Sequence, residues 1–301
     1  VSFDRNDIPI APGKRVNATA FILDSDLNQN PNSQETITAR LYARNATDGT
    51  VGNKAEIPTD ATVGTRKVNY YNVSLVETGP NTGNFSLKIA ILWGASSTTN
   101  SSIANYSSTT KHFYNLDRTQ DLLGGRLQVC INDGLGPTTL EVGPTGASIT
   151  VKGVCAARTF ATHGATMTAN ITSARVGTAV SFTLTEQDQN RDPAVKDTVQ
   201  ASFEIFRGTT TPVEGIAANH NGTVFLTETG VNTGVFTNSS RLGTGTDPFS
   251  RVNASQFIKI RYMDDAALGS ASITGLARAK ATASIVVGSS TGQASVIPAT
   301  Q

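Results

Sequence analysis

The sequence predicts an all-β protein made of two tandem sandwich domains, and three observations support this fold class. Apolar and polar residues alternate over short segments rich in Val, Ile, Thr and Phe, the pattern of half-buried strands. No window of twelve residues shows the 3.6-residue period with caps that predicts an α-helix. An internal repeat divides the 301 residues, a length at which chains commonly split into two cores.

Clusters of Gly, Asn, Asp and Pro separate the expected strands at short intervals, as in a sandwich. In the first copy, strands are expected at 16–23, 37–42, 71–76, 85–92, 127–131 and 147–154. In the second copy, they are expected at 179–184, 199–206, 224–226, 257–262 and 281–287.

The internal repeat consists of three matches that occur in the same order in both copies. An acidic loop ending in proline occurs twice, with Asp24, Asp26, Asn28 and Pro31 opposite Glu186, Asp188, Asn190 and Pro193. The motif Glu-Thr-Gly-x-Asn-Thr-Gly follows at 77–83 and 228–234, and strand-like segments follow at 127–133 and 258–264. Three ordered matches indicate a duplication.

The repeat sets the expected domain bounds. We expect an extended segment at 1–12, a first domain at 13–155 and a second domain at 156–301. The last two matches are 56 residues apart in the first copy and 36 in the second. The extra residues coincide with a Ser/Thr/Asn-rich tract near 94–112, which is expected to be an exposed loop.

Composition excludes several classes of partner. The chain has 24 Lys+Arg against 23 Asp+Glu, so its net charge provides no field to attract nucleic acid or anionic lipid. The longest apolar run, at 89–93, is too short to span a bilayer. Thr, Ser and Asn together account for 89 residues, which predicts a surface solvated by hydroxyls and amides.

No catalytic motif is recognisable, so we expect no enzyme activity. The sequence has no nucleophile elbow, no zinc-protease motif and no phosphate-binding glycine loop. Its three histidines, His112, His163 and His220, are scattered, and only the fold could assemble a catalytic triad around one of them.

The acidic loop of the first copy is the sharpest polar cluster and the candidate metal site. The second copy keeps oxygens at Glu186, Asp188 and Asn190, and both copies lack the glycine and terminal glutamate of an EF-hand loop. Alternating oxygens at Asp24, Asp26 and Asn28, with Glu77 and Asp133 at the same end of the sandwich, could hold calcium. Asp and Asn at a strand end also form turns that organise a connection, and this is the simpler interpretation. We therefore expect no cofactor other than N-linked glycans, with calcium the less favoured alternative.

The Glu-Thr-Gly-x-Asn-Thr-Gly motif is interpreted as a tight hairpin, in which Gly and Asn take positive φ.

Two features predict an exported protein. Asn-x-Ser/Thr sequons number about twice what the composition supplies by chance, and they become glycosylated only on an exported chain. The candidate acceptors are Asn17, Asn45, Asn72, Asn84, Asn100, Asn105, Asn170, Asn221, Asn238 and Asn253. Cys130 and Cys155 are too few for a zinc site, and a disulfide is favoured over two free buried thiols.

The acidic loop followed by the Glu-Thr-Gly-x-Asn-Thr-Gly-x-Phe hairpin, in tandem, resembles extracellular Ig-like domains of archaeal surface proteins. The sequence looks most like the glycosylated thread filament subunits of thermoacidophilic archaea, and S-layer modules share these motifs. The resemblance implies two Ig-like β-sandwiches at the cell surface. It also implies a homopolymer in which a terminal strand of one subunit completes the sheet of the next.

Residues 1–10 are the favoured donor strand, with the apolar positions Val1, Phe3, Ile8 and Ile10. An ordinary first strand of the chain's own domain is the alternative for this segment, and the C-terminal apolar segments at 284–287 and 296–298 are the alternative donor. Other functions left open are an S-layer module and a module that binds glycans or other surface proteins.

Overall fold

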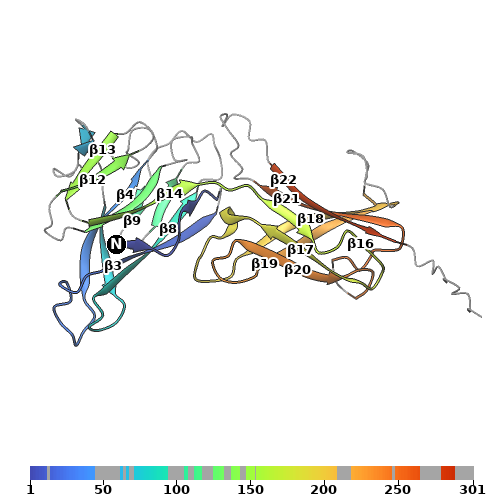
Figure 1. The fold of residues 1–301 in the computed structure, drawn as a ribbon, viewed down its shortest axis with the longest axis horizontal. Helices are drawn as coiled ribbons and strands as arrows, with labels where there is room; N and C mark the ends of the chain where they lie inside the picture. The colour runs from blue at the N-terminus through green and yellow to red at the C-terminus, as the bar shows by residue number, and fades with distance from the viewer. Residues whose placement is uncertain are drawn as a thin grey trace, which may run out of the picture.

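The computed structural model describes residues 1–11, 14–44, 62–63, 66–67, 71–93, 105–107, 112–116, 125–131, 137–142, 147–152, 154–208, 218–245, 248–264 and 279–288. Within these ranges the protein consists of strands and one short 3₁₀ helix, and it forms two β-sandwich domains arranged end to end along the longest axis of the molecule (Figure 1). The all-β, two-domain prediction is confirmed. No helix in the described part has the length and apolarity that a bilayer crossing requires.

The first domain follows the strand order β1-β3-β8-β7-β4-β11-β14-β2. These strands are β1 (Ser2–Phe3), β2 (Ile8–Pro9), β3 (Arg15–Leu23), β4 (Thr36–Arg44), β7 (Tyr71–Glu77), β8 (Asn84–Trp93), β11 (Arg126–Ile131) and β14 (Val154–Ala161). Alternate residues of the long strands point inward, because successive side chains of a strand lie on opposite faces. They enclose one core that includes Val16, Leu41, Phe85, Val129 and Phe160.

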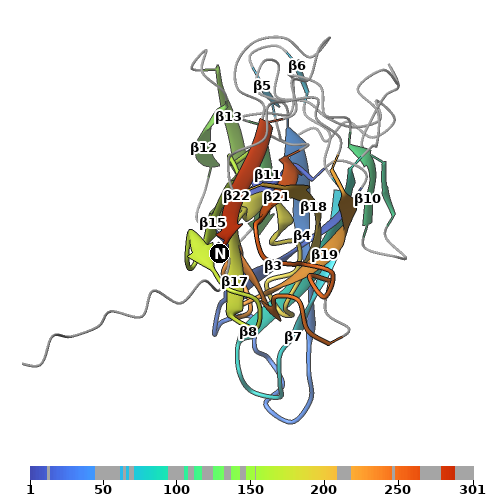
Figure 2. The same ribbon diagram turned by 90° about the vertical axis from the view of Figure 1, so that its right-hand side faces the viewer.

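The second domain repeats this order as β15-β17-β20-β19-β18-β21-β22-β16. Its strands are β15 (Thr166–Ala169), β16 (Ser173–Ala174), β17 (Ala179–Thr185), β18 (Thr198–Arg207), β19 (His220–Glu228), β20 (Val235–Arg241), β21 (Gln256–Asp264) and β22 (Ala279–Val287). The 3₁₀ helix η1 (Gln187–Gln189) follows β17. Each strand corresponds in place to one of the first domain, so the duplication seen in the sequence extends to the topology. Figure 2 views the molecule with this domain in front.

The expected boundary at 155/156 falls inside β14. This strand pairs with β11 from Arg126↔Thr159 to Ile131↔Val154, and its Phe160 is fully buried in the first core. The segment expected to be the last strand, 147–154, instead forms β13 (Ala147–Lys152) of a separate small sheet, with the order β12-β13-β5-β6. The first domain therefore ends at Ala161. The other strands of this sheet are β5 (Thr62–Val63), β6 (Arg66–Lys67) and β12 (Pro137–Val142).

The inserted tract near 94–112 is not only a loop. Its described residues form β9 (Asn105–Ser107), which pairs antiparallel with β10 (His112–Leu116). β10 in turn pairs in parallel with β8, so it adds a strand beside the end of β8. The remainder, 94–104 and 108–111, lies outside the described residues.

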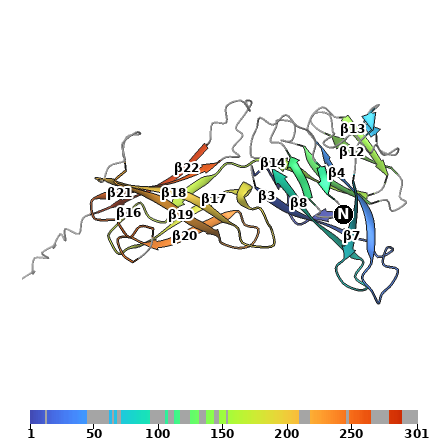
Figure 3. The same cartoon turned by 180° about the vertical axis from the view of Figure 1, so that it is seen from behind.

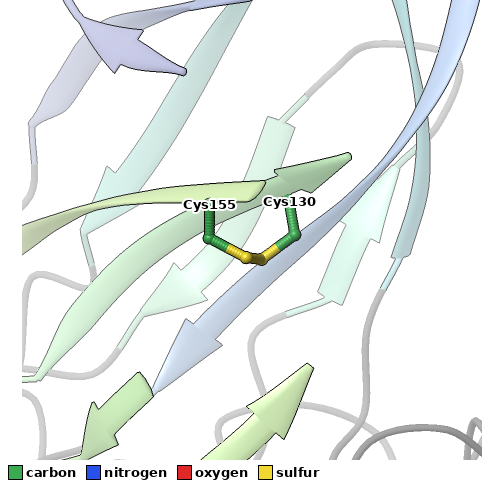
Figure 4. The surroundings of a disulfide bond; sticks show 2 residues. All are labelled: Cys130 and Cys155. Atoms are coloured by element: carbon green, nitrogen blue, oxygen red, sulfur yellow. A yellow bond between two sulfur atoms is a disulfide. The ribbon is translucent and has the colours of Figure 1, made fainter. Parts of the chain in front are cut away.

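The two cysteines form the expected disulfide (Figure 4). Cys130 on β11 and Cys155 on β14 lie directly opposite each other in the antiparallel register, with Cα atoms 4.1 Å apart. The bond links neighbouring strands of the same sheet and closes a loop of 25 residues. In the chain-entropy model, closing a loop of this size contributes about 3 kcal/mol to stability. A disulfide also favours an oxidising compartment, which is compatible with an extracellular location.

Candidate metal centre at the domain junction

The Glu-Thr-Gly-x-Asn-Thr-Gly motif forms the hairpin predicted from the sequence, joining β7 to β8 and β19 to β20. Asn81 and Gly83 have φ of 60° and 58°, and their counterparts Asn232 and Gly234 have 58° and 62°. A Cβ on Gly83 would lie 3.1 Å from the backbone oxygen of Asp24, so both conformation and space favour glycine there.

The sequence did not indicate what the glutamate of this motif does. Glu77 is buried, and its carboxylate accepts backbone N–H groups from Thr82, Gly83 and Glu35 at 2.7, 2.8 and 3.2 Å. Glu228 accepts the equivalent three groups in the second domain at 2.6, 2.7 and 3.1 Å. The glutamate therefore holds the hairpin closed and ties it to the strand that follows the acidic loop.

Glu77 makes the stability of the first domain depend on pH. Burial acts to raise the pKa of Glu77, but the N–H groups of Gly83, Thr82 and Glu35 outweigh it and hold the pKa below its usual value. A lowered pKa stabilises the fold above the unfolded pKa of about 4.3, and this contribution disappears as the pH falls through the folded pKa. We expect Glu77→Gln to destabilise the first domain at pH 7 and to lessen its loss of stability in acid. Thermal unfolding between pH 7 and pH 2 measures this, and an unchanged pH profile would contradict it.

Side chains from both domains meet at the junction, where the acidic loop of the second domain faces residues 4–11 and 14–17 of the first. Arg5 is buried and donates to the carbonyls of Asn17 and Asn190, both at 2.7 Å. Asp7 lies 2.9 Å from His163 in the linker. Asp192 accepts from Asn17 and also pairs with Lys88, at 2.8 and 2.9 Å.

Three carboxylates converge beside this junction: Glu186 before η1, Asp188 within it and Asp264 at the end of β21. Their exposed fractions are 0, 0 and 1%, and one oxygen of each lies within 4.8 Å of the others. Burial and the nearby Asp264 carboxylate raise the pKa of Glu186 to about 8. Burial also raises the pKa of Asp188 to about 9, with further contributions from Glu186, Asp264 and Asp7. Buried carboxylates at this spacing need bound protons or a bound cation.

Backbone N–H groups orient this cluster. Asp188 accepts from the N–H of His163 at 2.8 Å, and Asp264 from that of Ala165 at 3.0 Å, so both hold the interdomain linker. Glu186 accepts from the N–H of Asp188 at 2.9 Å. The other oxygens of Glu186 and Asp188, Oε2 and Oδ1, are buried and have no hydrogen-bond partner among the described residues.

Among the described residues, the candidate metal residues of the first copy do not converge as the three carboxylates of the second copy do. In the first copy, Asp24 accepts from the N–H of Asp26 at 3.0 Å, Asp26 is exposed, and Asn28 donates to Asn81 at 2.8 Å. These local hydrogen bonds are those expected if the loop is a turn that organises the connection after β3. The loop lies at the end of the first domain remote from the second (Figures 1 and 3). Asp133, the counterpart of Asp264, is outside the described residues.

The sequons differ in accessibility, and one of them is excluded. Asn17 is 8% exposed, and its amide donates to Asp192, so it cannot carry a glycan in this structure. The side chains exposed to solvent are Asn72, Asn170, Asn221 and Asn253, and those partly exposed are Asn84 and Asn238. Asn45 and Asn100 lie outside the described residues, as does the side chain of Asn105.

The expected donor segment belongs to its own domain in this structure. β1 pairs antiparallel with β3, and β2 pairs in parallel with β14. Phe3, Ile8 and Ile10 are buried in the first core, and Val1 packs against it. Residues 1–10 thus form the first strands of the first domain. At the other terminus, 284–287 lies within β22 of the second domain, and 296–298 is outside the described residues.

No protein-family model matches the chain, and no curated protein matches it. Among solved structures, the chain is similar to a type II cohesin dyad from the adaptor scaffoldin ScaA of Acetivibrio cellulolyticus. The two are 13% identical, the match covers 87% of each chain, and the TM-score is 0.15. At that score the similarity carries no argument about fold or function.

Proposed function

We propose that the protein is a structural subunit of an extracellular, N-glycosylated cell-surface filament, without enzymatic activity. Subunits join head to tail when residues 1–10 leave their own domain and occupy the same position in the next subunit. The observation that carries the proposal is the placement of residues 1–10. They supply two short strands on two different edges of one sandwich and fill its core with Phe3, Ile8 and Ile10.

Exchange of this segment is energetically reasonable because residues 1–10 make the same contacts whether they occupy their own domain or that of the next subunit. β1 and β2 each pair over only two residues, so few backbone hydrogen bonds hold the segment while it leaves. The apolar anchors and Arg5 then make their contacts in the neighbouring subunit. Such a contact joins two different surfaces and does not close on itself, so repetition yields a fibre. Exposed sequon asparagines on both domains support a glycosylated outer surface.

A pair of cysteine substitutions distinguishes residues 1–10 placed in their own subunit from residues 1–10 placed in the neighbouring subunit. Ser2 and Phe21 are register partners in the β1–β3 pair, a placement that suits a disulfide. With Ser2→Cys and Phe21→Cys together, exchanged subunits should become linked into a ladder of covalent multimers on a non-reducing gel. Either single variant should form dimers at most. If the double variant yields only internally closed monomers while electron microscopy shows fibres, residues 1–10 are not the donor.

A further inference from the structure

We propose that Glu186, Asp188 and Asp264 bind one divalent cation of the calcium class at the domain junction. This inference goes beyond the proposed function and does not depend on filament formation. The site differs from the acidic loop of the first domain, although the two loops descend from the same repeat.

Unsatisfied oxygens are the first argument. Glu186 and Asp188 have no exposed surface, and each uses one carboxylate oxygen to accept a backbone N–H group. Glu186 Oε2 and Asp188 Oδ1 have no partner among the described residues. A buried polar atom without a partner is costly, and a cation bound between these oxygens would satisfy both. The N–H groups on the opposite oxygens fix the carboxylates in place, as outer-sphere partners do in metal sites.

Charge balance is the second argument. The charged groups that act on Glu186 and Asp188 are other carboxylates: Asp264 acts on both, and Glu186 and Asp7 also act on Asp188. Arg5, which is buried at the junction, directs its donors to the carbonyls of Asp7, Asn17 and Asn190. Among the described residues, no arginine or lysine is one of the charged groups that act on Glu186 or Asp188, and a bound cation would neutralise these two carboxylates.

Geometry and ligand type select the calcium class. Two oxygens on opposite sides of one Ca²⁺ lie about 4.6–5.2 Å apart, since each Ca–O distance is about 2.3–2.6 Å. One oxygen from each carboxylate lies within 4.8 Å of the others, so all three can contact one such ion. The all-oxygen ligand set suits a hard cation, and Mg²⁺ gives up its water reluctantly to enter a buried site.

The position of the site indicates what the ion would do. Asp188 and Asp264 already accept the N–H groups of His163 and Ala165, which belong to the linker between the domains. An ion held by the same two carboxylates would fix the linker to η1 and β21. Binding would therefore stabilise the second domain and the junction together.

Calcium stoichiometry of the full chain tests the proposal. After removal of divalent ions and dialysis against 1 mM CaCl₂ at pH 7.5, elemental analysis should find one Ca²⁺ per chain, and calcium should raise the melting temperature. Asp188→Asn should abolish both effects. Asp26→Asn, the equivalent change in the first copy, should leave both intact.

Three results would overturn the proposal. The first is a wild-type chain that binds no calcium, which would mean that protons alone neutralise the cluster. The second is retention of the ion by Asp188→Asn, and the third is its loss from Asp26→Asn. If Asp188→Asn does not fold, the wild-type stoichiometry and the milder Glu186→Gln variant decide the question. Displacement of the ion by an equal concentration of Mg²⁺ would overturn the choice of calcium.

Discussion

Replacing Glu228 by alanine should lower the stability of the second domain by about 3–5 kcal/mol, since it removes a buried charged acceptor from several donors at once. The carboxylate accepts the N–H groups of Thr233, Gly234 and Asp197 and the hydroxyl of Thr233. With the side chain truncated, the buried N–H groups of Gly234 and Asp197 and the partly buried donors of Thr233 lose their acceptor. For a domain of this size, the melting temperature should fall by roughly 10–20 °C.

A comparison with Glu228→Gln separates loss of charge from loss of the acceptor. Glutamine keeps one carbonyl oxygen in a similar position, so it should cost less than alanine. Thermal and urea unfolding of the full chain measure both variants, with the first domain as an internal reference. If Glu228→Ala unfolds within about 1 kcal/mol of the wild type, the hairpin does not depend on this carboxylate, contrary to the usual cost of a broken buried network.

The repeat made much of the topology predictable. Two strands, β20 and β14, were nevertheless not predicted, for different reasons. β20 was not among the expected strands because Thr237, Asn238, Ser239 and Ser240 interrupt its apolar pattern, yet it occupies the place of β8. The repeat alone could have located it, since Phe236 follows the hairpin as Phe85 does. β14 was missed for the opposite reason: two adjacent segments, at 147–152 and 154–161, both have strand character. Only the pairing with β11 shows which one closes the first sheet.

The candidate site was partly predictable. The alignment placed Glu186 and Asp188 opposite the acidic loop of the first copy, and it placed Asp264 at the end of the third match. It could not show that the second copy is buried and the first exposed, because equivalent residues have equivalent local sequences. The difference is tertiary: η1 packs beside β2 and the linker, whereas the loop after β3 lies at a free end. The same packing buries Asn17, a sequon that the sequence could not distinguish from the others.

Replacing Arg5 by alanine should uncouple the two domains. The guanidinium donates to three backbone carbonyls, of Asp7 at 2.8 Å and of Asn17 and Asn190 at 2.7 Å, and the last lies in the second domain. Burial lowers the pKa of Arg5, although Asp4, Asp7, Asp197 and Asp192 act in the opposite direction. Hydrogen bonds from a charged donor contribute about 1.5–3 kcal/mol each, so loss of the bond to Asn190 alone should weaken the coupling measurably.

The expected result is a change from coupled to separate unfolding of the domains in calorimetry, together with a broader distribution of interdomain distances in small-angle scattering. Lys88→Ala is the matched control. Lys88 contacts the same loop through Asp192, but the lysine side chain is 49% exposed. An exposed ion pair contributes about 0–1 kcal/mol, so this variant should resemble the wild type. Equal effects of the two substitutions would mean that surface charge, rather than the buried Arg5 contacts, holds the junction. Arg5→Lys should resemble alanine more than the wild type, since one ammonium group cannot reproduce a fork that spans carbonyls in both domains.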